Sequence, residues 1–210
     1  MFRIDSADRW QWSEDVFPPL NFCVRALRLD GLRVAPFDAH PGGNNTLRER
    51  GLDAAAWRAW VTEVITARAA LTAPGLEARE STDPAALAAS SDVLRAPSAL
   101  CPGTTELRER LDEMWSDYRV NAERWKRSMT TGESGVRARL NPAATRWIWQ
   151  GLLPFHALLA TLTVFLVEYP VPVILTVPPS VCVIAPDFSD PDHLGYAKMV
   201  VRAAEELAAR

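Results

Sequence analysis

The chain has 210 residues, 48% of them hydrophobic, so it can bury a substantial core and suits one domain of ordinary size. Its formal net charge of −3 is too small to drive bulk attraction to nucleic acid or to an anionic membrane. Charged residues begin at Arg3, where a secretory signal would carry an apolar run, so no such signal is expected.

Cysteine and arginine usage bears on the compartment and the source. The three cysteines, Cys23, Cys101 and Cys182, are widely spaced and odd in number, which favours buried free thiols in a reducing cytoplasm. Arginine outnumbers lysine 21 to 2, a bias typical of a GC-rich bacterial genome. We therefore expect a cytoplasmic bacterial protein.

The first predicted element is a β-hairpin. Two apolar runs, residues 20–29 and 32–37, are joined by Asp30-Gly31, a pair that favours a tight hairpin turn. A two-residue loop would place Arg28 opposite Arg33 on one face of the hairpin. Because like charges in that position repel, the pair predicts a bound anion or a nearby carboxylate. A solvated face with splayed guanidinium groups is the alternative.

Two amphipathic helices are predicted next. The first spans residues 54–71, with Asp53 as its N-cap and Trp57 on its buried side. The second spans residues 106–127, and its apolar stripe has spacings of four, three, four and seven: Leu107, Leu111, Met114, Tyr118 and Trp125. The stripe is shorter than a coiled coil requires, which favours core packing. A partner surface is the alternative.

Three further helices are indicated by their boundary residues. Asp83-Pro84 begins a short alanine-rich helix to about residue 95, and Asn141-Pro142 begins another that Pro154 should end or kink. The last helix is predicted over residues 191–209, with these side chains buried: Leu194, Ala197, Val201, Ala204 and Leu207.

Residues 147–186 contain a single formally charged side chain, Glu168, so they must be hidden from water. The uncharged stretch 147–167 is long enough to span a bilayer, but Gln150, Pro154 and His156 offset much of its insertion energy. The β-branched runs at 171–177 and 181–185, separated by prolines, are typical of strands. We therefore predict a helix followed by buried strands in a protein core.

These elements predict an α+β fold. The N-terminal β-hairpin and the short C-terminal strands are expected to share one mostly antiparallel sheet, packed by about five helices. A single α+β domain over residues 1–210 is expected, with an irregular exposed segment near 128–141.

Two Asp/His clusters follow predicted strands. Asp38 and His40 are candidate catalytic residues, because a carboxylate can orient an imidazole base or share a metal with it. Asp187 and His193 are the matching candidates near the C-terminus, and a hard cation there would be held by Asp187, Asp190, Asp192 and His193. The same residues have a purely structural explanation. Those at 38–45 are typical of a turn, and those at 187–193 can cap the final helix, so no metal is expected.

A third candidate site is the arginine- and tryptophan-rich segment 119–149. Its two acidic residues, Glu123 and Glu133, are outnumbered by seven basic ones, a surplus of five positive charges: Arg119, Arg124, Lys126, Arg127, Arg137, Arg139 and Arg146. Trp125, Trp147 and Trp149 interleave with these basic residues. Basic side chains with aromatic neighbours can bind an acidic protein, a nucleotide or single-stranded nucleic acid. A solvated charged face is the alternative, and the acidity of the whole chain disfavours nucleic acid.

No phosphate-binding loop, dinucleotide fingerprint, zinc-helix pair or nucleophile elbow occurs, and no cofactor is expected. The sequence therefore favours a non-enzymatic binding or adaptor subunit that contacts another protein through the arginine- and tryptophan-rich surface. The alternative is a metal-assisted hydrolase built from the Asp/His clusters at 38–40 and 187–193. Membrane association through 147–167 carries the least weight.

Overall fold

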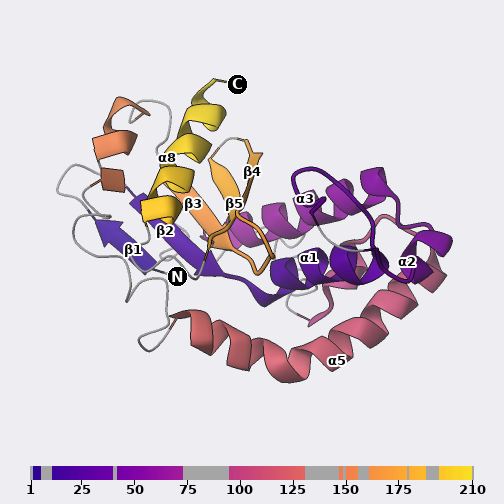
Figure 1. Cartoon of the computed structure of the whole chain (residues 1–210). Helices are drawn as coiled ribbons and strands as arrows, with labels where there is room; N and C mark the ends of the chain where they lie inside the picture. Colours follow the sequence, from indigo (N-terminus) through magenta and orange to yellow (C-terminus); the bar gives the residue numbers. More distant parts are fainter. Residues whose placement is uncertain are drawn as a thin grey trace. The chain divides into compact units, whose positions relative to one another are not determined.

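The computed structural model describes residues 2–5, 11–39, 42–72, 95–130, 147–148, 150–155, 161–178, 180–187 and 194–209 (Figure 1). The chain divides into two compact units. Unit 1 combines Met1–Phe17 with Glu123–Arg210, and unit 2 comprises Pro18–Ala122. Unit 2 is thus an insertion in the sequence of unit 1, and each unit is described by itself below.

Unit 1 contains a five-stranded sheet in the order β1-β2-β3-β5-β4. The strands are β1 (Phe2–Asp5), β2 (Gln11–Val16), β3 (Thr161–Leu166), β4 (Val173–Val177) and β5 (Val181–Ala185). The central pairs β2/β3 and β3/β5 are parallel, whereas the outer pairs β1/β2 and β4/β5 are antiparallel. The fold is α+β as predicted, but the prediction of a mostly antiparallel sheet is wrong, because the middle of the sheet is parallel.

Strand β3 lies in the second half of the uncharged stretch 147–167, although strands were predicted only after residue 170. Residues 147, 148 and 150–152 are helical and lead into a 3₁₀ turn, η2 (Leu153–Phe155), which contains Pro154. The Thr-Leu-Thr-Val-Phe-Leu run of β3 then pairs Thr163 with Val181 and Val164 with Cys182. β-Branched residues pack well on a pleated sheet, and a continuous apolar run suits a strand that is buried on both faces.

The core of unit 1 lies between one face of the sheet and helix α8 (Leu194–Ala208), which packs on β4 and β5. Alternate strand residues such as Val164 and Ile184 meet α8 through Tyr196 and Val200. Gly151 belongs to the same contact, because a Cβ there would approach Val201 Cγ2 to 2.5 Å. The predicted burial of Leu194 is wrong, since this first residue of α8 is 39% exposed.

Unit 2 is helical throughout its named elements. These are α1 (Pro18–Asp30), α2 (Thr46–Glu49), α3 (Ala54–Thr72), the 3₁₀ turn η1 (Pro97–Leu100) and the part of α5 (Thr105–Thr130) before residue 123. Each of three indoles in this unit donates its Nε1–H to a backbone carbonyl: Trp57 to Cys23 (3.0 Å), Trp60 to Pro97 (2.6 Å) and Trp115 to Arg95 (2.7 Å). Buried indoles therefore fix the backbone as well as fill the core.

The predicted hairpin over residues 20–37 is wrong, because residues 20–29 belong to α1. The apolar run is long enough for a buried helix, and apolar runs of this kind do not distinguish a helix from a strand. Gly31 has a φ of +71°, and its N–H donates to the carbonyl of Arg28 (3.1 Å), so Asp30-Gly31 ends a helix. The second predicted strand, residues 32–37, is replaced by an isolated β-bridge between Val34 and Phe37.

Helix α3 confirms its predicted start and buried side. Asp53 Oδ1 accepts the N–H of Ala56 at 2.7 Å, which is N-capping geometry. Trp57, Trp60 and Val64 are all at most 1% exposed. The predicted helix over 84–95 lies outside the described residues apart from Arg95.

Helix α5 was also predicted, but its buried stripe differs in detail. Leu107, Leu111, Trp115, Tyr118 and Ala122 are buried, at spacings of four, four, three and four. Met114 and Trp125 are half-buried, so the stripe follows the helical period more closely than predicted. Among the described residues, no helix is long and apolar enough to cross a membrane.

Replacing Leu111 by alanine should destabilise the protein, because Leu111 is fully buried and the substitution opens a cavity. We expect the free energy of unfolding to fall by about 2 to 5 kcal/mol. Met114→Ala is the matched control on the same helix, and its effect should be clearly smaller since Met114 is half-buried. Urea denaturation of both variants measures the difference, and equal losses would contradict this assignment of the stripe.

Candidate functional site

Helix α5 carries the arginines of the predicted binding segment, and its buried side positions it in unit 2. Phe22 of α1 stacks edge-on against Trp60 and Trp115, with ring centroids 6.1 and 5.2 Å apart. Asn21 donates its amide to the Tyr118 hydroxyl at 2.8 Å. Ser98 donates its hydroxyl to Asp112. These contacts fix the rotation of α5 and thereby decide which side chains face solvent.

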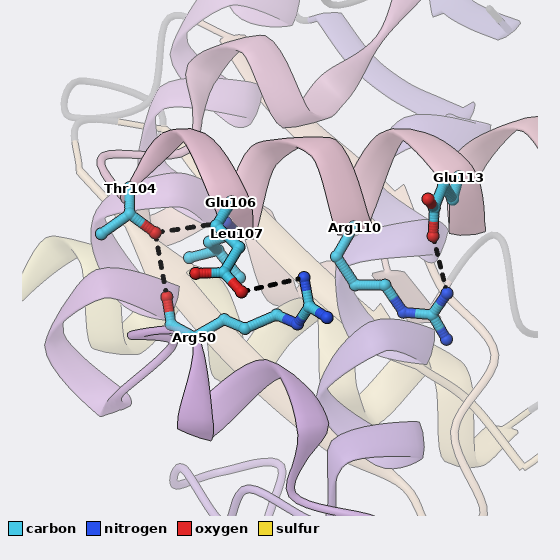
Figure 2. A network of polar contacts seen from close by, with 6 residues as sticks. All are labelled: Arg50, Thr104, Glu106, Leu107, Arg110 and Glu113. Carbon is cyan, nitrogen blue, oxygen red and sulfur yellow. Dashed lines mark hydrogen bonds and ion pairs between the residues drawn. The ribbon is translucent and has the colours of Figure 1, made fainter.

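The first turn of α5 is held by a polar network (Figure 2). Thr104 Oγ1 accepts the N–H of Leu107 (3.2 Å) and donates to the carbonyl of Arg50 (3.1 Å). Arg50 also forms an ion pair with Glu106 at 3.4 Å. Thr104 therefore caps the helix and ties it to the turn after α2. The partners are largely exposed, so the ion pair contributes at most about 1 kcal/mol.

Four predicted anion-binding residues lie in the second half of α5. Arg119, Arg124 and Arg127 are exposed, and Lys126 is half-buried. Arg127 Nε donates to the carbonyl of Glu123 at 3.2 Å. Trp125 packs against the hydrophobic core of unit 1 instead of presenting its ring to solvent.

The remaining predicted partner residues are placed only in part. Arg137, Arg139 and Arg146 lie outside the described residues, whereas Trp147 is 38% exposed. The cross-strand pair of Arg28 and Arg33 does not exist, because no hairpin forms. Arg28 lies in the last turn of α1, where a cation complements the helix dipole, and Arg33 is exposed in the turn that follows.

The two Asp/His clusters belong to different units. Asp38 is an exposed residue of unit 2, and Asp187 is an exposed residue of unit 1. Their predicted partners His40, Asp190, Asp192 and His193 lie outside the described residues. In the part of the chain that the structure describes, no three His, Cys, Asp or Glu side chains are grouped to hold a metal ion.

Sequence reasoning missed the role of Asp30, which is fully buried. Its Oδ1 accepts the N–H groups of Leu47 (2.8 Å) and Arg48 (3.2 Å) at the start of α2. Asn45, the residue before α2, has a left-handed φ of 58° and makes no side-chain cap. Asp30 therefore caps α2 from 17 residues away, while its Oδ2 is buried without a hydrogen-bond partner. In the sequence, Asp30-Gly31 indicates only a turn, and nothing near it predicts that Asp30 caps a helix 17 residues away.

The loop that carries Asn45 is pressed against the end of α1. The N–H groups of Asn44 and Asn45 donate to the carbonyls of Leu29 and Asp30, each at 3.2 Å. A Cβ on Gly31 would come within 2.0 Å of the Gly43 nitrogen, so a side chain there would displace the loop. The glycines at 31 and 43 therefore serve close backbone packing, and this packing keeps Asp30 within reach of α2.

The three cysteines are buried free thiols, as predicted. Burial raises the pKa of Cys23 well above its usual value, and the neighbouring Cys101 raises it further. Burial also raises the pKa of Cys101 to about 11, although Arg108 partly opposes this shift, and it raises the pKa of Cys182. A reactive cysteine requires a thiolate near neutral pH, so these thiols are poor nucleophiles.

Comparisons with protein-family models, with curated proteins and with solved structures found no match to this chain.

Replacing Asp30 by alanine should leave the Leu47 and Arg48 N–H groups without their acceptor. We expect a loss of about 1 to 3 kcal/mol in the free energy of unfolding. Asp30→Asn keeps an acceptor oxygen of the same shape and should lose less than about 1 kcal/mol. Chemical denaturation tests both variants; a larger loss for asparagine would contradict the capping role.

The stability contributed by Cys101 should depend on pH. A thiol whose pKa is raised by folding stabilises the native state fully below its unfolded pKa, near 9, and this contribution disappears as the pH rises through about 11. The free energy of unfolding of the wild type, relative to Cys101→Ala, should therefore fall between about pH 9 and 11. Urea denaturation at several pH values measures this difference, and a constant difference would contradict burial of the thiol.

Proposed function

We propose that the chain is a non-enzymatic binding or adaptor subunit that contacts an acidic surface of another protein through the second half of α5. One observation supports this proposal above the others. Between Arg119 and Arg127, four basic side chains stand against one acidic side chain, and three of the four arginine and lysine residues are exposed on a single helix.

The helix gives these cations a defined spacing. Arg124 and Arg127 are three residues apart, which places them one above the other on one side of α5. The half-buried Trp125 between them packs on the core of unit 1, so the helix is anchored there by the side opposite to the arginines. Preorganised charges of this kind raise the rate and the specificity of association with an oppositely charged partner.

Charge reversal in α5 tests this proposal. A pull-down from the native host would compare wild-type bait with Arg124→Glu/Arg127→Glu, whose changes lie on an exposed side of α5. We expect an acidic protein that is retained by the wild type at low salt and lost from the variant. Retention should also fall at about 1 M salt, where the Debye length is only about 3 Å.

The matched control is Arg33→Glu/Arg58→Glu, which changes the net charge equally at exposed positions in unit 2. This control should retain the partner. Circular dichroism of both variants verifies that the fold is intact. A partner that binds the α5 variant as well as the wild type, at low and at high salt, would overturn the proposal and move the binding surface elsewhere.

A further inference from the structure

Strand β4 forms one edge of the sheet in unit 1. In the order β1-β2-β3-β5-β4, it pairs with β5 on one side and has no neighbouring strand on the other side among the described residues (Figure 1). An edge strand presents backbone N–H and C=O groups to which a strand of another molecule can pair. The pairing of β5 with its other neighbour, β3, determines which N–H groups of β4 point to this free edge.

The even-numbered residues of β5 direct their backbone groups toward β3. Thr163 of β3 donates its N–H to the carbonyl of Ser180 (2.9 Å), and Val167, just after β3, donates to the carbonyl of Ile184 (3.1 Å). The backbone groups of successive residues in a strand point alternately to its two neighbours. The odd-numbered residues of β5 therefore direct their N–H and C=O groups toward β4.

The same alternation fixes the free edge of β4. Val183 of β5 lies opposite Leu175, so this pair exchanges hydrogen bonds within the sheet. The N–H groups of Ile174 and Thr176, one position away on either side, then point to the free edge. Outside the helices and strands, no backbone hydrogen bond between described residues involves these two N–H groups.

Prolines occupy both positions where the next outward N–H groups would lie. Pro172 precedes Ile174 by two positions, Pro178 follows Thr176 by two, and both prolines are exposed. Proline has no backbone N–H, and in sheets it occurs at edges, where the missing donor faces solvent. The free edge of β4 therefore offers the N–H groups of Ile174 and Thr176 and no further donor at either end.

The two prolines halve the hydrogen bonding available to a second copy of the strand. If two β4 edges paired antiparallel about Leu175, Ile174 of each copy would lie opposite Thr176 of the other. Each such pair exchanges two hydrogen bonds, so the two pairs would form about four in all. Residue 172 would lie opposite residue 178, and N–H groups at these positions would add about four more. Proline at both positions removes these additional bonds.

Strand β4 lacks the other features that protect an edge strand from such pairing. Its sequence, Val-Ile-Leu-Thr-Val, contains no charge, and its pairing with β5 runs from 173 to 177 without a bulge. Its five residues are a typical strand length, so shortness gives little protection. The opposite edge strand, β1, contains Arg3 and Asp5. At the β4 edge, protection depends on the flanking prolines.

We infer that Pro172 and Pro178 prevent the β4 edge from pairing with β4 of a second copy of this chain. An uncharged strand rich in β-branched residues is prone to edge-to-edge association, and prolines next to such a strand oppose it. The inference concerns strands of unit 1 and does not depend on the proposed adaptor function, which rests on the arginines of α5.

Replacing both prolines by threonine tests the inference. Pro172→Thr/Pro178→Thr supplies the missing N–H groups and adds β-propensity without a large apolar surface. We expect this variant to self-associate at least about tenfold more tightly than the wild type, as measured by sedimentation velocity over a range of concentrations. The matched control, Pro102→Thr/Pro170→Thr, makes the same change in composition at exposed positions outside β4 and should sediment like the wild type.

Amide hydrogen exchange followed by NMR locates the association. In the wild type, the amides of Ile174 and Thr176 should exchange at least about a hundredfold faster than that of Leu175, which is bonded within the sheet. In the associated Pro172→Thr/Pro178→Thr variant, the amides of residues 174 and 176 should become protected, because a second strand then accepts both hydrogens.

The inference is wrong if the wild type already protects both amides, or if the double variant sediments like its control. It is equally wrong if the variant associates while both amides still exchange fast, because the contact then lies elsewhere. Circular dichroism verifies that the variants are folded. If the double variant is unfolded, Pro172→Thr and Pro178→Thr are compared singly with Pro170→Thr, and each should associate more tightly than that control.

Discussion

The parallel pairing of β2 with β3 is the constraint on which the architecture depends. Val16 ends β2 and pairs with Leu166, so the chain must leave one end of the sheet and return to the other before it can form β3. Parallel neighbours always need such a crossover, and here it carries all of unit 2. The insertion follows from this pairing, and so does the position of α5, whose residues after Ala122 return the chain to unit 1.

Within unit 2, Phe22 brings three helices together. It lies on α1 and contacts Trp60 of α3 and both Trp115 and Tyr118 of α5, so one side chain sets the mutual packing of these helices. Arg25 extends the cluster by placing its guanidinium 5.7 Å from the centre of the Tyr118 ring. Because the aromatic side of α5 is buried in this packing, its charged side faces solvent. The surface chemistry of α5 is therefore a consequence of how its core side packs.

The charges on α5 have an intrahelical role as well as the proposed intermolecular one. Acidic residues dominate its first half and basic residues its second, which is the order that the helix dipole favours. The dipole acts mainly on the first and last turns, however, and exerts little influence on Glu109, Glu113 or Arg119. The dipole therefore does not account for the charges in the middle of the helix, and the basic ones among them belong to the surface that is proposed to bind a partner. The buried thiols and the separate Asp/His residues offer no comparable arrangement among the described residues.

The sequence by itself determined the helices and strands whose ends are set by capping or turn residues close by in the sequence. Asp53 marks the start of α3, and the proline-bounded β-branched runs mark β4 and β5, because capping and turn formation act over three or four residues. The α5 arginines that carry the proposed function were likewise identified from composition alone. Their exposure was not, since it depends on which side of the helix packs.

Only the tertiary structure decided the elements that lack local signals. Residues 20–29 and 161–166 are mostly apolar, so their pattern fits a helix or a strand. The first run was predicted as a strand and forms a helix, whereas the second follows a predicted helix and forms a strand. The same glycine at position 31 serves a hairpin or a helix end, because both need a positive φ. Strand order and the capping of α2 by Asp30 join residues far apart in the sequence. Such pairings depend on the whole packed core, which no short window of sequence contains.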